Sequence, residues 1–242
     1  ADSVVKSFRM KSRKVPDLAA WDSLANTIET VDHPVRIGVI GKYFSTGDFI
    51  LSDAYLSVLE AIKHAAWSIG RKPVIEWLNS EAYEQDPLKL KELDRYDGVL
   101  VPGGFGSRGI EGKMAAINYV REHKIPYFGI CYGMQCAVIE FARSVLGLTD
   151  AHTTEIAPKT KNPVIHLMND QAKKLKGTGI GGTLRLGAYL CDLKAGSISR
   201  ESYGMDQISE RHRHRYEFNN DYRQQLIGAG LVIAGTSPDD HV

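Results

Sequence analysis

Residues 125–142 read Ile125-Pro-Tyr-Phe-Gly-Ile-Cys-Tyr-Gly-Met-Gln-Cys-Ala-Val-Ile-Glu-Phe-Ala142. The apolar run after Pro126 predicts a short buried parallel strand, and apolar side chains from Met134 onward recur at helical spacing. Between strand and helix lies Gly129-Ile-Cys-Tyr-Gly133, where the two glycines remove side chains that would clash in a sharp turn. This pattern is typical of a nucleophile elbow with cysteine in place of serine.

Cys131 stands at the predicted N-terminus of the helix in this stretch. The partial positive charge of a helix N-terminus favours the thiolate, which is the nucleophilic form of cysteine. A buried structural cysteine in an ordinary strand-loop-helix turn is the alternative, because the five-residue motif is short.

The composition narrows the class of protein. With 242 residues, 43% of them hydrophobic, and no apolar run near 18 residues, we expect a soluble globular chain of one domain, with or without an appendage, and no membrane partner. A net charge of +1 argues against nucleic acid as a partner. Three cysteines and no secretory signal predict a cytoplasmic protein, and the absence of a Cys-x-x-Cys motif argues against a metal site.

The first part of the chain alternates predicted strands and helices. Residues 1–28 are basic up to Lys14 and then form a short amphipathic helix that starts at Pro16-Asp17. Strands are predicted at 35–40, 73–78, 96–102 and 125–130, and helices at 52–69 with a cap at Ser52-Asp53, around 88–93, and at 113–123. This alternation predicts an α/β fold with a doubly wound, mainly parallel open sheet and helices on both faces.

The loop that follows the third predicted strand is rich in glycine. Residues 103–112 contain five glycines, at the carboxyl end of a parallel strand, where open α/β sheets have their sites. Backbone N–H groups in such a loop can approach a ligand closely. A flexible connection without a binding role is the alternative.

The second half of the chain changes character. Strands predicted at 163–168 and 183–193, the latter with alternating polarity, indicate a smaller antiparallel sheet, and 228–235 reads as one more turn and strand. Gly177-Thr-Gly-Ile-Gly-Gly182 has the letters of a dinucleotide-binding loop but the reverse context, so we reject that function. In Arg211-His-Arg-His-Arg-Tyr-Glu-Phe-Asn219, strand alternation would give a face of arginines, which is suited to a carboxylate or is simply a solvated edge.

Several segments together resemble one known family. They are Pro102-Gly-Gly-Phe-Gly106, Gly129-Ile-Cys-Tyr-Gly-Met-Gln135, Glu155, Gly181-Gly-Thr-Leu-Arg-Leu-Gly187 and Arg211-His-Arg-His-Arg-Tyr-Glu217. From about Pro16 to Val242 the chain resembles the glutaminase domains of the CTP synthases, a family of class I glutamine amidotransferases with a Cys-His-Glu triad. The elbow alone indicates only the broad class. The glycine-rich loop and the arginine-rich run distinguish this family from the glutaminases of GMP synthetase and carbamoyl-phosphate synthetase.

The resemblance implies hydrolysis of glutamine to glutamate and ammonia. Cys131 would then be the nucleophile that forms a glutamyl thioester, and the backbone N–H groups of Gly104 and Tyr132 would form the oxyanion hole. The implied substrate-binding residues are Gly104, Phe105, Gly133, Met134, Gln135, Glu155 and Arg215. Charge complementarity independently favours Glu155 for the α-ammonium group of glutamine and Arg215 for its α-carboxylate.

The resemblance also carries expectations for an effector loop and for domain organisation. Arg108, Gly109 and Glu111 resemble the lid segment that communicates GTP activation. Residues 1–28 would be the tail of a preceding amidoligase domain plus a linker helix. Residues 29–242 would be the amidotransferase domain, ending before the His-Pro-Glu-Phe motif that supplies the catalytic base and its orienting acid. Should a base lie inside the chain, His152 or His166 would be the first candidates.

Partners and cofactors follow from the same resemblance. No cofactor is expected in this domain, whereas the full-length enzyme would use ATP and Mg²⁺, with GTP as allosteric activator, to aminate UTP to CTP. L-glutamine and the amidoligase domain are the expected partners, and the full-length enzyme is expected to be a homotetramer. The glutaminase of another class I amidotransferase and a non-catalytic glutaminase-like module stay open as alternatives. The joint presence of Cys131, Gly104, Glu155 and Arg215 favours the enzyme.

Overall fold

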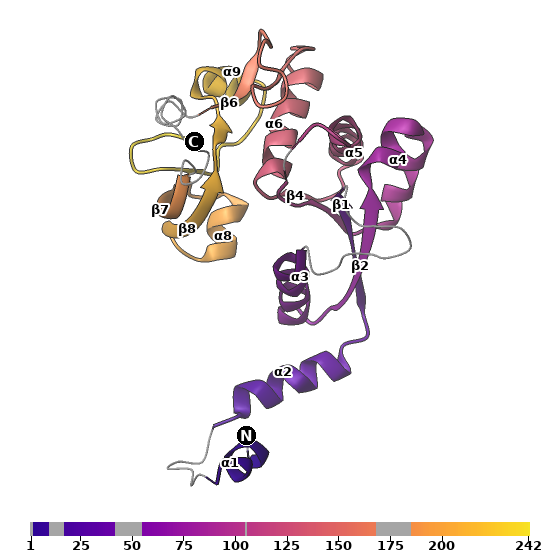
Figure 1. Cartoon of the computed structure of the whole chain (residues 1–242), viewed down its shortest axis with the longest axis vertical. Coiled ribbons are helices and arrows are strands. Elements are labelled where there is room, and N and C mark those ends of the chain that lie inside the picture. Colours follow the sequence, from indigo (N-terminus) through magenta and orange to yellow (C-terminus); the bar gives the residue numbers. More distant parts are fainter. Residues whose placement is uncertain (1, 10–16, 42–54, 105, 168–184) are drawn as a thin grey trace. The chain divides into compact units, whose positions relative to one another are not determined.

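The structure is a computed structural model that describes residues 2–9, 17–41, 55–104, 106–167 and 185–242 (Figure 1). The chain divides into two compact units. The first consists of Ala1–Val35 and Leu56–Val74, and the second of Arg36–Tyr55 and Ile75–Val242.

The first unit contains the helices α1 (Asp2–Ser7), α2 (Ala19–Thr30) and α3 (Leu56–Ser68), and α2 contacts α3. Asp17 accepts a hydrogen bond of 3.0 Å from the N–H of Ala19, in agreement with a helix start at Pro16-Asp17. The helix α2 has no buried residue, and its Trp21 is exposed. The cap predicted at Ser52-Asp53 lies outside the described residues.

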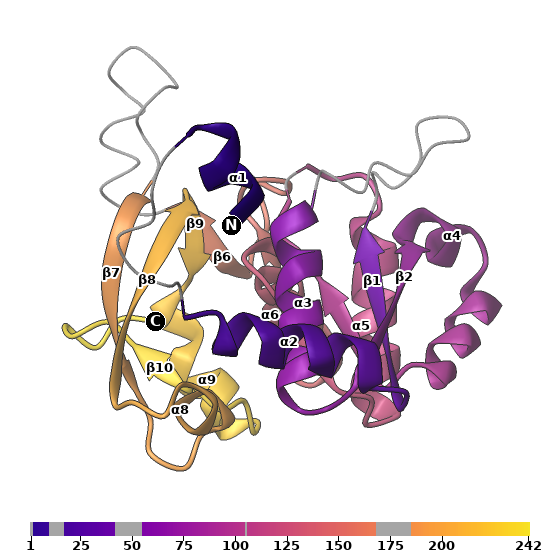
Figure 2. The same ribbon diagram turned by 90° about the horizontal axis from the view of Figure 1, so that it is seen from below.

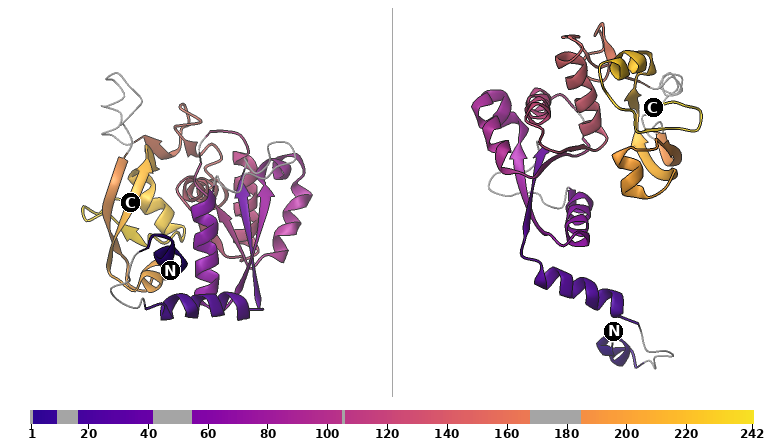
Figure 3. Two further views of the ribbon diagram at one scale, coloured as in Figure 1. Left: turned by 60° about the horizontal axis from the view of Figure 1, so that its bottom comes forward. Right: turned by 180° about the vertical axis from the view of Figure 1, so that it is seen from behind.

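The second unit is built on a parallel sheet with the strand order β2-β1-β3-β4. Figure 3 shows the strands of this sheet side by side. Its strands are β1 (Pro34–Gly41), β2 (Lys72–Asn79), β3 (Gly98–Val101) and β4 (Tyr127–Gly129), and the first residues of β1 and β2 fall within the ranges of the first unit. All four residues of β3 are buried, as expected for a central strand covered on both faces. The chain passes from β1 to the edge strand β2 and then returns to β3 on the other side of β1. The direction of winding therefore reverses between β1 and β3, the point where such sheets bind ligands.

Helices flank this sheet, which confirms the predicted α/β class. They are α4 (Ser80–Gln85), the 3-10 helix η2 (Pro87–Arg95), α5 (Ile110–Glu122) and α6 (Tyr132–Ser144). The helix α5 packs against both α4 and α6, and α6 contacts β3 and β4. Because α6 also contacts β6, it joins the parallel sheet to the second half of the unit.

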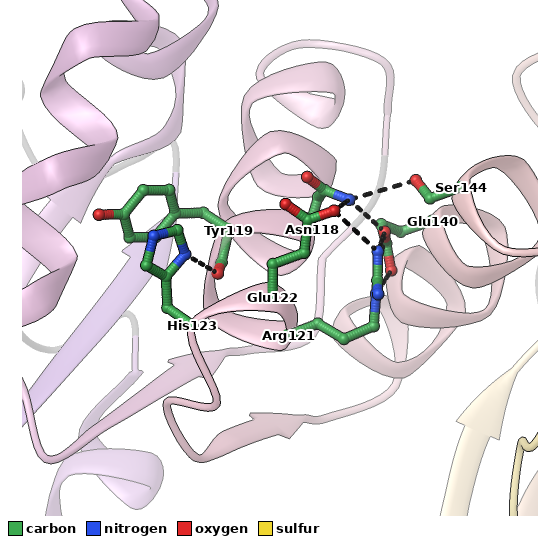
Figure 4. Close-up of polar contacts among 7 residues, drawn as sticks. All are labelled: Asn118, Tyr119, Arg121, Glu122, His123, Glu140 and Ser144. Atoms are coloured by element: carbon green, nitrogen blue, oxygen red, sulfur yellow. Dashed lines mark hydrogen bonds and ion pairs between the residues drawn. The ribbon is translucent and has the colours of Figure 1, made fainter.

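A buried ion pair fastens α5 to α6 (Figure 4). Arg121 on α5 binds both carboxylate oxygens of Glu140 on α6, at 2.9–3.2 Å. Asn118 donates to the same carboxylate at 2.9 Å and to the hydroxyl of Ser144 at 3.3 Å. This cluster, which we call the α5–α6 clamp, satisfies a carboxylate that is only 3% exposed.

The second half of the unit contains two smaller sheets (Figure 2). In the first, β6 (Pro163–Leu167) pairs in parallel with β5 (His152–Thr153) and antiparallel with β9 (Tyr216–Phe218). In the second, β7 (Arg185–Leu193) pairs antiparallel with β8 (Gln207–His214) and β10 (Gly235–Thr236). The remaining elements are α8 (Ile198–Tyr203), η3 (Asn220–Tyr222) and α9 (Arg223–Gly228). The predicted smaller antiparallel sheet is thus confirmed.

Three predictions differ from the structure in detail. The helix expected around 88–93 is a 3-10 helix. The carboxylate of Asp86 caps its start by accepting a hydrogen bond from the N–H of Leu88. The strand expected within 228–235 is limited to its last residue, Gly235, which begins β10. The arginine-rich run is two strands rather than one, because the chain leaves β8 at Arg215 and pairs next with β6. The rejected glycine motif at 177–182 lies outside the described residues.

Candidate active site

The elbow after β4 has a strained backbone at the cysteine. Cys131 adopts φ +52° and ψ −104° at the N-cap of α6, a left-handed conformation that is unfavourable for a residue with a side chain. A Cβ on Gly129 would lie 2.6 Å from backbone atoms of Gly133 and Met134, and a Cβ on Gly133 would lie 2.1 Å from the carbonyl oxygen of Val101. Both glycines are therefore required for the turn that presents the thiol.

The ionisation of Cys131 differs from the simplest expectation for a helix N-terminus. Burial raises the pKa of its thiol, the backbone N–H of Tyr132 lowers it, and the carboxylate of Glu155 raises it further. The net pKa lies above the ordinary value, so the helix terminus does not by itself produce a thiolate. Cys131 is nonetheless exposed, whereas Cys136 is fully buried and burial raises the pKa of Cys136 to about 12.

The glycine-rich loop after β3 lies against the elbow. A Cβ on Gly103 would be 3.5 Å from the Cβ of Cys131, whereas a Cβ on Gly104 would meet nothing within 4 Å. The backbone of Gly104 is thus open to a ligand beside the thiol. The hydroxyl of Tyr132 donates to the carbonyl oxygen of Gly106 at 2.8 Å. Phe105 lies outside the described residues.

A cavity of about 700 Å³ brings together most of the predicted site. It is lined by Gly103, Gly104, Cys131, Tyr132, Gln135, Glu155, Arg213, His214, Arg215 and Tyr216. A second cavity, of about 560 Å³, also reaches Cys131 and Gln135 and is lined in addition by Met134, His212, His214 and Val242. Of the predicted substrate-binding residues, Met134 therefore lines only the second cavity, and Gly133 lines neither because it is buried in the turn.

Arg215 and Glu155 give the larger cavity one positive and one negative group. Arg215 is half-buried at the crossover from β8 to β9, and Glu155 is half-buried in the turn after β5. Both act on Tyr216: burial and the Glu155 carboxylate raise the pKa of that phenol, and the Arg215 guanidinium lowers it. The amide of Gln135, in the first turns of α6, donates to the carbonyl oxygen of Tyr216 at 2.9 Å. This bond links the elbow helix directly to the residue that follows Arg215.

The predicted effector residues line neither cavity. Arg108 forms an ion pair with Glu81 on α4. Gly109 begins α5 with φ +71°, and Glu111 binds Arg143 on α6 at 2.9 and 3.2 Å. The segment is therefore fixed to the two helices that flank α5, next to the glycine-rich loop.

Two residues of the arginine-rich run join the predicted site residues. His214 lines both cavities, and its Nδ1 lies 3.1 Å from the carbonyl oxygen of Tyr216, which also lines both. His152 and His166, the first internal candidates for a base, line neither cavity. The sequence places His214 and Tyr216 in the motif that contains Arg215, but it does not assign either of them a role of its own.

The described part of the chain offers neither a metal site nor a membrane-spanning helix. Within it, no group of three or more His, Cys, Asp or Glu side chains could hold a metal ion. Within the same residues, no helix combines the length and apolar character needed to span a bilayer.

Comparison with known proteins agrees with this geometry. Residues 50–242 match the family described as glutamine amidotransferase class-I. A CTP synthase from Staphylococcus aureus is 47% identical over 238 residues, which are 98% of this chain and 43% of that protein. A CTP synthase from Clostridium acetobutylicum is 48% identical over 242 residues, which are 100% of this chain and 43% of that protein. The chain thus spans less than half the length of these relatives.

A solved structure is also similar to the fold. The glutaminase domain of Trypanosoma brucei CTPS with bound acivicin matches with a TM-score of 0.74 and 36% sequence identity, over 84% of this chain and 75% of that one. The matched residues 50–242 include both the elbow cysteine and the open glycine loop beside it. This chain belongs to the class I glutamine amidotransferases.

Proposed function

We propose that the chain hydrolyses L-glutamine to glutamate and ammonia through a thioester on Cys131. The observation that carries this proposal is that Cys131, Gly104, Glu155 and Arg215 line one and the same cavity. Glutamine has an α-ammonium, an α-carboxylate and a side-chain amide. Glu155 suits the first group, Arg215 the second, and Cys131 the carbonyl carbon of the third.

The chemistry proceeds in two halves. The Cys131 sulfur attacks the amide carbon, and the N–H groups of Gly104 and Tyr132 stabilise the oxyanion of the tetrahedral intermediate. The carbon–nitrogen bond then breaks, and the nitrogen leaves as ammonia after it takes up a proton. Water next attacks the thioester carbon, which releases glutamate and restores the thiol. Gln135 contributes through its hydrogen bond to the carbonyl oxygen of Tyr216, which holds the β8–β9 crossover with Arg215 against α6.

A general base is needed because the pKa of the Cys131 thiol is raised. We propose that the His-Pro-Glu-Phe motif of the family supplies it, and that the base reaches the sulfur through the second cavity, where Val242 also lies. A chain that carries this motif should hydrolyse glutamine at least about 10² times faster than residues 1–242, the scale of general acid–base assistance. His214 is the internal alternative, and equal rates in the two chains would favour it.

The proposal extends to the whole protein. The similarity to CTP synthases supports a role as the glutaminase part of a cytoplasmic CTP synthase, in which the ammonia aminates UTP in an ATP-dependent ligase reaction. ATP, Mg²⁺ and the activator GTP belong to that full-length activity. Residues 1–28 would then be the tail and linker that follow an amidoligase domain, and residues 29–242 the amidotransferase domain. The homotetramer is part of the same proposal.

Covalent labelling tests the glutaminase proposal. The probe is 6-diazo-5-oxo-L-norleucine, a diazoketone in which a diazomethyl group replaces the amide nitrogen of glutamine and which alkylates a thiol with loss of N₂. Peptide mapping should find the label on Cys131, and L-glutamine should slow its attachment more than D-glutamine does. Cys191→Ser, which removes a thiol on β7 remote from the cavity lining, serves as the control and should label like the wild type. Labelling that L-glutamine does not slow would refute the proposal.

A further inference from the structure

The side-chain hydroxyl of Tyr132 has no role in the proposed mechanism, although the backbone N–H of the same residue belongs to the proposed oxyanion hole. Its phenol ring is buried, with 2% of the residue exposed, and its hydroxyl donates to the carbonyl oxygen of Gly106 at 2.8 Å. Burial raises the pKa of this phenol, so the group stays protonated and acts as a donor. The proposed mechanism employs only the backbone N–H of Tyr132, and the hydrogen bond of its side chain has no part in it.

We propose that Tyr132 is a positioning residue that ties the two oxyanion donors together. Its own N–H is one donor, and its hydroxyl holds the loop whose Gly104 N–H is the other. A change in the separation of the two donors would weaken their joint contact with the oxyanion, because such donors act at 2.7–3.1 Å. This inference rests on the proposed glutaminase function.

The hydrogen bond from Tyr132 matters to the glycine-rich loop because the loop has few side chains of its own. Gly103, Gly104 and Gly106 carry no side chains that could anchor the segment to the core, and Gly106 adopts φ +83°. Among the described residues, the hydroxyl of Tyr55 also donates to the carbonyl oxygen of Gly103, at the longer distance of 3.5 Å. The shorter bond from Tyr132 is the stronger of these two contacts between a tyrosine hydroxyl and the loop.

The ring of Tyr132 is itself held by α5. The ammonium group of Lys113, a residue that is 3% exposed, lies 5.1 Å from the centre of the ring. Ile110 and Met114 of the same helix belong to the apolar cluster that includes Tyr132. The helix α5 starts directly after Arg108 and Gly109, so the effector segment and the oxyanion loop meet at one side chain.

Tyr132→Phe tests the inference in the full chain, since it removes the hydroxyl and keeps the ring. Hydrolysis of L-glutamine by Cys131 gives a saturating rate, which reports chemistry at the carbonyl, and a half-saturation concentration, which reports binding. Iodoacetamide alkylation of the same thiol reports its nucleophilicity without the site. The matched control is Tyr83→Phe, which removes another buried phenol hydroxyl, bonded to Glu92 at 2.8 Å, away from both cavities.

We expect Tyr132→Phe to lower the saturating rate about tenfold, less than the 10²–10³ lost when an oxyanion donor is removed outright. The half-saturation concentration and the iodoacetamide rate should stay within about twofold of wild type, and Tyr83→Phe should leave all three unchanged. Lys113→Met, which keeps the hydroxyl and removes the charge over the ring, should lower the saturating rate in the same direction by a smaller factor.

Two results would overturn the inference: an unchanged saturating rate in Tyr132→Phe, or a parallel fall of all three readouts that Tyr83→Phe reproduces. The second result would mean that the hydroxyl serves stability alone. Failure of the proposed function looks different, because the wild-type chain would then show no saturable hydrolysis of L-glutamine and no protection of Cys131 by L-glutamine against 6-diazo-5-oxo-L-norleucine.

Discussion

Removing Arg121 from the α5–α6 clamp should destabilise the protein more than removing the charge of Glu140. Arg121 and Glu140 form three hydrogen bonds of 2.9–3.2 Å, yet their environments differ. The Glu140 side chain is 3% exposed and that of Arg121 is 33% exposed. Arg121→Met leaves a carboxylate that water can hardly reach, whereas Glu140→Gln leaves a guanidinium that water can partly solvate.

The magnitudes follow from this difference. Breaking a buried ion pair by removing one partner costs about 3–5 kcal/mol, and the bond that Asn118 retains with Glu140 puts Arg121→Met near the lower end, at about 3 kcal/mol. Glu140→Gln keeps the shape of the side chain and should cost about 1.5 kcal/mol, the scale of a hydrogen bond to a charged group. For a chain of this length, 1 kcal/mol shifts Tm by about 2–4 °C. We therefore expect Arg121→Met to lower Tm by about 6–12 °C and Glu140→Gln to lower it by about 3–6 °C.

Urea unfolding and thermal melts of the two single variants and the double variant measure these values. The double variant should lose less than the sum of the single losses, because it leaves no unpaired charge. Glu60→Gln is the control: it breaks the exposed pair with Lys63, at 2.7 Å, and should cost less than about 1 kcal/mol. The reasoning fails if Glu140→Gln is as costly as Arg121→Met, or if both match the control.

Three further predictions concern the site. Iodoacetamide should modify Cys131 before the two other cysteines, and the rate should rise with pH until the pH passes the pKa of Cys131, which lies above that of a free thiol. Glu155→Gln should lower this pKa because it removes a nearby negative charge, and a pH–rate profile of the two proteins measures both effects. Arg215→Ala should weaken glutamine binding by about 1.5–3 kcal/mol, and lysine at this position should not restore it, which calorimetry would detect and an unchanged affinity would contradict. Gly133→Ala should prevent the elbow from forming, since its Cβ would lie 2.1 Å from the Val101 carbonyl oxygen, and native-like melting and labelling in this variant would refute that reading.

The sequence could predict the parallel sheet and the elbow because their signals are local. Apolar runs separated by helical periodicity define β1 to β4, and the glycines at 129 and 133 mark a turn that only a residue without Cβ permits. The difference at η2 is also local, since the nine residues Pro87–Arg95, which follow the cap at Asp86, suit either a short α-helix or a 3-10 helix. Periodicity does not distinguish the two.

The sequence could not predict the crossover at Arg215 or the state of the Cys131 thiol. Alternation along 211–219 is compatible with one strand or with two, and only pairing with β7 and then β6 decides between them. The thiol pKa depends on burial and on Glu155, whose approach is a product of tertiary structure. The α5–α6 clamp is hidden for the same reason, because Arg121 and Glu140 lie on different helices.

These limits explain why the proposed site divides into a predictable and an unpredictable half. Val101 at the end of β3 is in register with Gly129 at the end of β4, so the loop of Gly104 and the elbow of Cys131 must emerge side by side from the parallel sheet. That half carries the reacting groups. In the proposed site, the groups for the amino-acid end of the substrate, Glu155 and Arg215, come from the turn after β5 and from the β8–β9 crossover, and the Gln135 amide joins that crossover to α6. Substitutions at these two residues should therefore weaken the binding of glutamine and leave the elbow and the oxyanion loop in place.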